Sequence, residues 1–221
     1  MRSRFGAAGL LAATAVLAVA CATADDWSEP HAKPSAVGTL GPGFVNSAAP
    51  PTPEATITPS PGSWGDVRPS PGYRVVLLTT GDAPETKTLV NAVTEWAGQE
   101  EVSLKTVTAD APARFTASIT EAMDRKPDLI ICAGKDLVDP LTVITANHLD
   151  QQFLVLGAEL AEPTANVTAA NWPGASFRGE GLGTSTGYDP ASFTPERAAA
   201  AVRAGVASVL SGLTGIVIRL G

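Results

Sequence analysis

The sequence predicts a single α/β domain built on a doubly wound parallel sheet with helices on both faces. Two continuous apolar runs, at 74–80 and 128–134, are bounded by turn residues, which is typical of strands buried on both faces. Segments with apolar residues at helical spacing, such as 84–99, lie between the strand-like runs. Strands that alternate with helices indicate βαβ units and therefore a parallel sheet.

The first half of this domain gives clear element signals. The strand at 74–80 stops at Gly81. The helix at 84–99 starts with a proline, which suits a first helical turn. Alternating residues predict a strand at 102–108, and an apolar stripe predicts a helix at 112–125.

The second half continues the alternation. After the strand at 128–134, the pattern predicts a short helix and two strands, at 139–148, 153–157 and 166–171. Residues 178–193 form a Gly-rich loop whose role the sequence does not indicate. Thr194 is a suitable N-cap for the next helix, Gly212 suits its end, and a final strand follows at 216–220. Right-handed crossovers predict the sheet order 2-1-3-4-5 for the first five strands.

The N-terminus has the pattern of a lipoprotein signal peptide. Arg2 and Arg4 precede an uncharged run at 5–20 that is too short to span a bilayer comfortably. The run ends at Cys21 in a sequence that resembles a bacterial lipobox, so we expect residues 1–20 to be removed and Cys21 to be acylated, with palmitate-type chains. This places the protein at the cell membrane, lipid-anchored on the extracytoplasmic face. The alternative is an ordinary secretory signal with an incidental cysteine.

Residues 21–72 are expected to form a disordered tether that begins at the lipidated cysteine. Residues 22–72 hold ten of the 18 prolines and show no apolar period. A polyproline-like chain of this length could reach on the order of 150 Å from the membrane. The aromatic residues Trp27, Phe44 and Trp64 are expected to be inert there, and short docking motifs are the alternative. The folded domain is predicted to start at residue 73 and to run to residue 221.

Composition excludes several function classes. The formal charge is −7 and no basic stripe is present, so nucleic-acid binding is not expected. The chain has two cysteines and two histidines without metal-ligand spacing, so neither a metal nor another cofactor is expected. Cys132 lies in a predicted buried strand and should be inert. No nucleophile motif or Walker motif is visible, and we do not expect an enzyme; a hydrolase or transferase using strand-end acids is the remaining alternative.

In parallel α/β sheets, ligands bind at the carboxyl ends of the strands. This edge should present a ligand-binding set of seven residues: Thr80, Gly81, Asp82, Gly134, Asp136, Asp139 and Trp172. The three acids could equally cap helices, and Trp172 could pack in the core.

Four stretches resemble the basic membrane protein (BMP) family. They are the Pro-Asp step with its apolar strand at 126–134, the strands at 152–157 and 166–168, Phe-Arg-Gly-Glu-Gly at 177–181, and the helix and strand at 204–217. Members of this family are lipid-anchored receptors of ABC transporters with a type I periplasmic-binding-protein-like fold, often for nucleosides. The resemblance implies a Rossmann-like, periplasmic-binding-protein-like lobe that binds a nucleoside or another small molecule for transport or sensing.

This sequence departs from the family pattern in ways that bear on the site. Asp82 matches the acid of the family's first loop, but the nearby Phe-Asn pair has no counterpart, and either Asp136 or Asp139 could match a later acid. Residues 182–192 look like an insertion. Only the first lobe is represented, with 204–217 resembling the start of a second, so a partner protein or a homodimer is expected to complete the site. The alternative is a structural or protein-interaction lipoprotein domain that binds no ligand.

Overall fold

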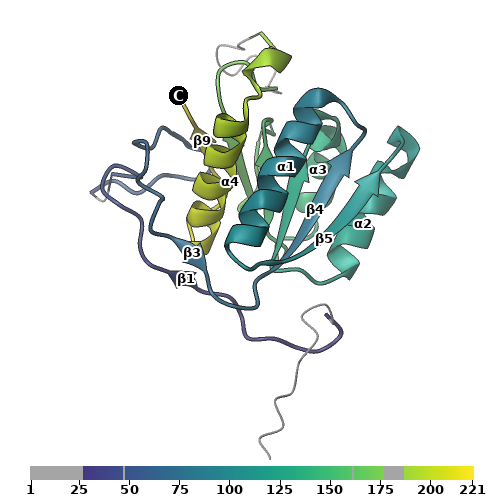
Figure 1. Cartoon of the computed structure of the whole chain (residues 1–221), viewed down its shortest axis with the longest axis horizontal. Coiled ribbons are helices and arrows are strands. Elements are labelled where there is room, and N and C mark those ends of the chain that lie inside the picture. The colour runs from purple at the N-terminus through teal and green to yellow at the C-terminus, as the bar shows by residue number, and fades with distance from the viewer. Residues whose placement is uncertain (1–26, 47, 161, 177–186) are drawn as a thin grey trace, which may run out of the picture.

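The computed structural model describes residues 27–46, 48–160, 162–176 and 187–221. They form one parallel sheet with helices on both faces (Figure 1), which confirms the predicted fold class. In the described part of the chain the sheet has seven strands in the order β2-β9-β8-β7-β6-β4-β5. The strands are β2 (Thr56–Ile57), β4 (Arg74–Thr80), β5 (Ser103–Ala109), β6 (Leu129–Ala133), β7 (Phe153–Leu156), β8 (Val167–Asn171) and β9 (Val217–Arg219).

The order β5-β4-β6-β7-β8 is the predicted 2-1-3-4-5 arrangement, which is therefore confirmed. Four α-helices of the described chain cover the two faces: α1 (Pro84–Gln99), α2 (Phe115–Asp124), α3 (Val138–Thr145) and α4 (Pro195–Leu210). Alternate residues of β4 separate two cores, because side chains of a strand point to opposite faces. Val75 and Leu77 face the core of α1 and α4, whereas Val76 and Leu78 face the core of α2 and α3.

Local signals explain where the helices begin and end. The hydroxyl of Thr194 accepts a hydrogen bond from the Arg197 N–H at 3.3 Å, which confirms the predicted cap of α4. The predicted helix at 112–125 begins as a short turn, η1 (Pro112–Arg114), and a similar turn, η2 (Lys135–Leu137), precedes α3. α3 ends at residue 145, earlier than predicted, because the side-chain amide of Asn166 donates to the carbonyls of Thr145 and His148.

Residues 27–46 and 48–72 pack against the domain, so the expected disordered tether is wrong for them. β1 (Ala36–Val37) and β3 (Arg68–Pro69) form an antiparallel ribbon, and β2 adds a parallel strand beside β9. Phe44 is 1% exposed and Trp27 is 8% exposed, while Trp64 packs against the core of α1 and α4. The aromatic side chains were expected to be inert, yet their buried area stabilises this Pro-rich segment. The domain therefore does not start at residue 73.

The final predicted strand is part of the same sheet. β9 pairs in parallel with β8, with Ala170 opposite Ile218 and Asn171 opposite Arg219. α4 lies directly on the sheet, because a Cβ at Gly205 would meet the Leu154 side chain at 2.5 Å. The expectation that this helix and strand open a second lobe is wrong for the described chain, in which they complete the first.

Three predicted features lie outside the described residues: the leader with Cys21, the stretch 177–181, and most of the Gly-rich loop. Among the described helices, none combines the length and the apolar character needed to cross a membrane. One short turn of the loop region is described, η3 (Pro190–Ser192), just before α4.

Candidate functional site

Three neighbouring strands turn sharply at their carboxyl ends. β4, β6 and β7 are followed by Gly81, Gly134 and Gly157, all with positive φ. At Gly134 the φ angle is 123°, and a Cβ atom would lie 2.7 Å from the Thr80 hydroxyl. Glycine is therefore required there both by the backbone conformation and by the close approach of β4.

These turns surround a central cavity of about 310 Å³. It holds five of the seven predicted ligand-binding residues: Thr80, Gly81, Asp82, Gly134 and Asp136. Its other walls come from the start of α1, the end of β7, and a segment at 187–193 that crosses the strand ends. These walls contribute charged and aromatic side chains that the sequence interpretation did not select: Glu85, Lys135, Tyr188 and Phe193.

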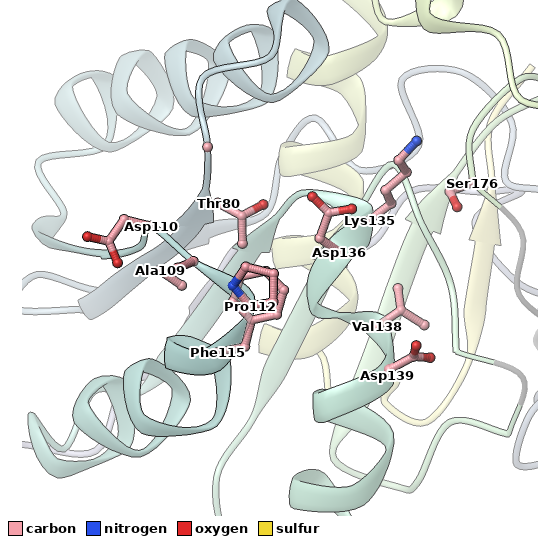
Figure 2. A pocket seen from close by; sticks show the side chains of 12 residues that line it. Thr80, Ala109, Asp110, Pro112, Phe115, Lys135, Asp136, Val138, Asp139 and Ser176 are labelled. Atoms are coloured by element: carbon pink, nitrogen blue, oxygen red, sulfur yellow. The ribbon is translucent and has the colours of Figure 1, made fainter.

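A side cavity of about 630 Å³ opens beside the central one, toward α2 and α3. Thr80, Gly81, Lys135 and Asp136 line both cavities, and Asp139 lines the side cavity. Figure 2 shows Asp110 and Asp136 on either side of Thr80, with Pro112 and Phe115 forming an apolar wall and Asp139 at the start of α3. The side cavity therefore combines carboxylates with one apolar surface.

Tyr188 connects the 187–193 segment to both neighbouring elements. Its hydroxyl donates to Glu85 Oε1 at 2.8 Å, and its ring centroid lies 3.9 Å from Lys135 Nζ. Phe193 packs edge-on against Tyr188, with ring centroids 5.9 Å apart. An aromatic ring beside an ammonium group is a favourable cation–π arrangement. The segment thus holds a charged, aromatic rim over the central cavity.

The charge states of this rim follow from its contacts. The pKa of Glu85 is lowered, first by a hydrogen bond from its own backbone N–H and then by the Tyr188 hydroxyl. The pKa of Tyr188 is raised, first by burial and then by its bond to Glu85. At neutral pH Glu85 is therefore a carboxylate, and Tyr188 keeps the proton that it donates.

Thr80 carries the most distinctive polar group of the site. Its side chain is 4% exposed, and its hydroxyl has no hydrogen-bond partner among the described residues. A buried hydroxyl without a partner costs about 1–3 kcal/mol. Thr80 itself lies on the wall shared by the two cavities.

The three predicted acids are also candidates for helix capping, the alternative to ligand binding. The cap positions of α1 and α3 are Ala83 and Leu137, so none of the three predicted acids is a cap residue. Asp82 is exposed and lies 3.6 Å from Lys87 Nζ. Asp139 is in the first turn of α3, where the helix dipole also favours an acid.

Trp172 lies beneath the site and lines neither of the two cavities. It is 2% exposed, its indole N–H donates to the Ser192 hydroxyl at 3.0 Å, and its ring contacts Phe193 edge-on. Its packing holds Phe193, which lines the central cavity. Trp172 therefore packs in the core, which was the alternative to a place in the ligand-binding set.

The described part of the chain offers neither a metal-binding cluster nor a reactive thiol. No group of three or more His, Cys, Asp and Glu residues with metal-binding geometry occurs in that part. Cys132 is fully buried, and burial raises the pKa of its thiol, which disfavours the reactive thiolate.

No family model matches the sequence, and no curated protein matches it. Several solved structures contain a chain of similar fold, including the three that follow. A solute-binding protein of an ABC transporter system from Aeropyrum pernix K1 aligns with 18% identity and a TM-score of 0.41, over 46% of this chain and 29% of its own. A fragment from Peptoclostridium difficile 630, provisionally named a lipoprotein, aligns with 16% identity and a TM-score of 0.45, over 62% of this chain and 98% of its own.

A periplasmic ribose ABC transporter protein from Conexibacter woesei aligns with 17% identity and a TM-score of 0.37, over 67% of this chain and 54% of its own. The alignments with this protein and with the Aeropyrum protein span less than two thirds of those chains. The geometry of the carboxyl edge, rather than these alignments, is the basis for assigning a function.

Proposed function

We propose that this protein is an extracytoplasmic lipoprotein whose domain binds a small polar solute at the carboxyl edge of the sheet. The observation that carries the proposal is the buried, unpartnered hydroxyl of Thr80 on the wall between two cavities. Natural proteins pair most buried polar groups, and exceptions often mark functional positions. A bound solute would satisfy this hydroxyl.

The surroundings favour a nucleoside-like molecule. Carboxylates at Asp110 and Asp136 can accept hydrogen bonds from sugar hydroxyls, and the rings of Phe115 and Tyr188 offer apolar surfaces for a base. The two cavities share the wall at Thr80, and their volumes fall within the range of about 300–1,000 Å³ usual for small-molecule sites. Acids outnumber Lys135 there, which disfavours a phosphorylated ligand.

The anchor and the partners belong to the same proposal. Acylation of Cys21 would hold the protein at the outer face of the membrane. The cavities lie at the edge of a single domain, and a second copy or a partner protein would bury more of the solute. Through such a partner the protein would sense the solute or pass it to an ABC transporter. The alternative is an interaction domain that binds no solute.

Calorimetric titration of the chain from residue 22 onward with a panel of nucleosides tests the solute proposal. We expect saturable heat for at least one nucleoside. Thr80→Val keeps the side-chain volume but removes the hydroxyl, so affinity should fall about tenfold, the equivalent of one hydrogen bond.

Thr79→Val is the matched control for this titration. The Thr79 hydroxyl is also buried and unpartnered in the described chain, but it lines neither cavity. Its loss should leave the affinity unchanged. Absence of heat with every nucleoside at millimolar concentration would favour the interaction-domain alternative. Intact mass of the membrane-extracted protein tests the anchor separately, because an unmodified Cys21 would contradict it.

A further inference from the structure

The beginning of the described chain is fastened to the edge of the sheet opposite the cavities. The Trp27 indole N–H donates to the Ser103 hydroxyl at 2.9 Å, and Lys105 Nζ lies 4.6 Å from the centroid of the Trp27 ring. Ser103 is the first residue of β5. Arg74, the first residue of β4, donates to the Trp27 carbonyl at 3.3 Å. Trp27 is therefore held at the amino ends of the edge strand β5 and of its neighbour β4.

His31 provides a second attachment at the same edge. Its Nε2 atom lies 2.9 Å and 2.8 Å from the two carboxylate oxygens of Asp128, directly before β6. The same carboxylate accepts a bond from the Arg74 backbone N–H at 2.8 Å. Figure 1 shows the purple start of the described chain beside the ends of β4 and β5 that lie opposite their arrowheads. Residues 27–31 thus contact the amino ends of three adjacent strands.

These contacts set a short distance between the proposed anchor and the sheet. Cys21 is six residues before Trp27, and a fully extended chain spans at most about 3.6 Å per residue, or about 20 Å in all. β4 rises by about 3.3 Å per residue, so Thr80 lies about 20 Å beyond Arg74. The site is therefore at the edge of the sheet that lies away from the anchor. Only a short length of chain joins the anchor to the near edge.

We propose that residues 27–31 orient the domain on the membrane, with the amino-terminal edge of the sheet facing the lipid and both cavities facing away from it. This inference rests on the lipid anchor of the proposed function. It implies that the partner completing the site approaches from the extracytoplasmic side, because a protein embedded in the same membrane meets the opposite edge.

Energy transfer on vesicles tests this orientation with the full-length lipidated protein. Asp150→Cys places a fluorophore near the amino end of β7, and Thr108→Cys places one near the carboxyl end of β5; both positions are exposed. Cys132 is fully buried and should not react with the dye. The vesicles contain phosphatidylcholine, phosphatidylglycerol and a small fraction of lipid with an acceptor dye on its headgroup. The label at 150 should transfer energy more efficiently than the label at 108.

Releasing the attachment should abolish this difference. The double variant Trp27→Ala, His31→Ala removes both contacts, so the two labels should then give equal transfer. Val37→Ala is the control, because Val37 is 51% exposed on the β1–β3 ribbon and the difference should persist. Equal transfer from both labels in protein that floats with the vesicles would overturn the orientation while leaving the anchor intact. Protein that does not float and carries an unmodified Cys21 would instead overturn the anchor, and the orientation with it.

Discussion

Thr80 and Glu159 are both almost fully buried near the carboxyl edge, but their polar atoms are satisfied differently. The Thr80 hydroxyl has no partner among the described residues, whereas Glu159 Oε2 accepts a bond from the Asn171 side-chain amide. Burial raises the pKa of Glu159, and the charge of Arg219 and the bond from Asn171 oppose this rise only in part. The ionised form of Glu159 is therefore disfavoured in the folded protein.

Glu159→Gln should stabilise the protein at neutral and alkaline pH. A folded-state pKa above the unfolded value of about 4.3 gives stability below that pH, which is lost as the pH rises through the folded pKa. Glutamine stays neutral and can still accept the bond from Asn171, so we expect a gain of about 1 kcal/mol at pH 8 and little change at pH 4. Thermal unfolding at the two pH values measures this.

Glu162→Gln is the control for this substitution, because Glu162 is exposed and should show no such pH-dependent gain. A lower melting temperature of Glu159→Gln at pH 8 would show that the carboxylate is paired rather than disfavoured.

Among single residues, the sequence predicted those site residues that stand at the end of a strand. Thr80, Gly81 and Gly134 could be predicted because a buried apolar run ends at each of them. Tyr188 and Phe193 could not, because a Gly-rich loop has no periodicity that indicates where it crosses the sheet. Trp172 was ambiguous because a strand-end aromatic can face either the core or the solvent.

A side-chain hydrogen bond between Tyr188 and Glu85 links segment 187–193 to α1 and can be tested directly. Tyr188→Phe removes the donor to Glu85 but keeps the ring beside Lys135. The pKa of Glu85 should rise toward its ordinary value, because one of its two main stabilising hydrogen bonds is lost. Titration of the glutamate carboxyl signals by NMR measures the change.

Glu196 is an internal reference for this titration. Its pKa is lowered by its own backbone N–H and by Thr194, on a different element. It should be unaffected by Tyr188→Phe. An unchanged pKa of Glu85 in the variant would show that the Tyr188 bond does not persist in solution.

Element type and order were predictable because continuous apolar runs and helical stripes occur in clear alternation from residue 74 onward. The end of an element was less predictable where a side chain far along the sequence forms hydrogen bonds with it. Asn166 binds the carbonyls at the end of α3 from 21 residues further along the chain, and no local pattern indicates this. The cap at Thr194 was predictable because its partner is three residues away.

The folded unit of the whole molecule includes a Pro-rich N-terminal segment. On composition alone, this segment was expected to lie outside the folded domain. Composition averages over a window and does not detect a few well-placed aromatic side chains. Phe44 contributes to the core of α1 and α4, and β2 covers the edge of β9. The folded unit therefore begins before the point at which the apolar periodicity begins.

Removal of residues 22–72 should destabilise the domain. Each large apolar side chain buried by this segment contributes about 1.5–3 kcal/mol, so a chain of residues 73–221 should unfold at a clearly lower denaturant concentration than one starting at residue 22. Chemical denaturation followed by circular dichroism compares the two. Equal midpoints would show that the segment packs without stabilising the sheet.

The most direct test of solute binding at the carboxyl edge is an NMR titration of the ¹⁵N-labelled chain from residue 22 with a nucleoside. Saturable shifts should appear at Thr80, Gly81, Gly134 and Asp136, while the amide of Ser103 at the opposite edge should not move. An absence of shifts at millimolar nucleoside, or shifts confined to residues away from both cavities, would contradict the proposed site.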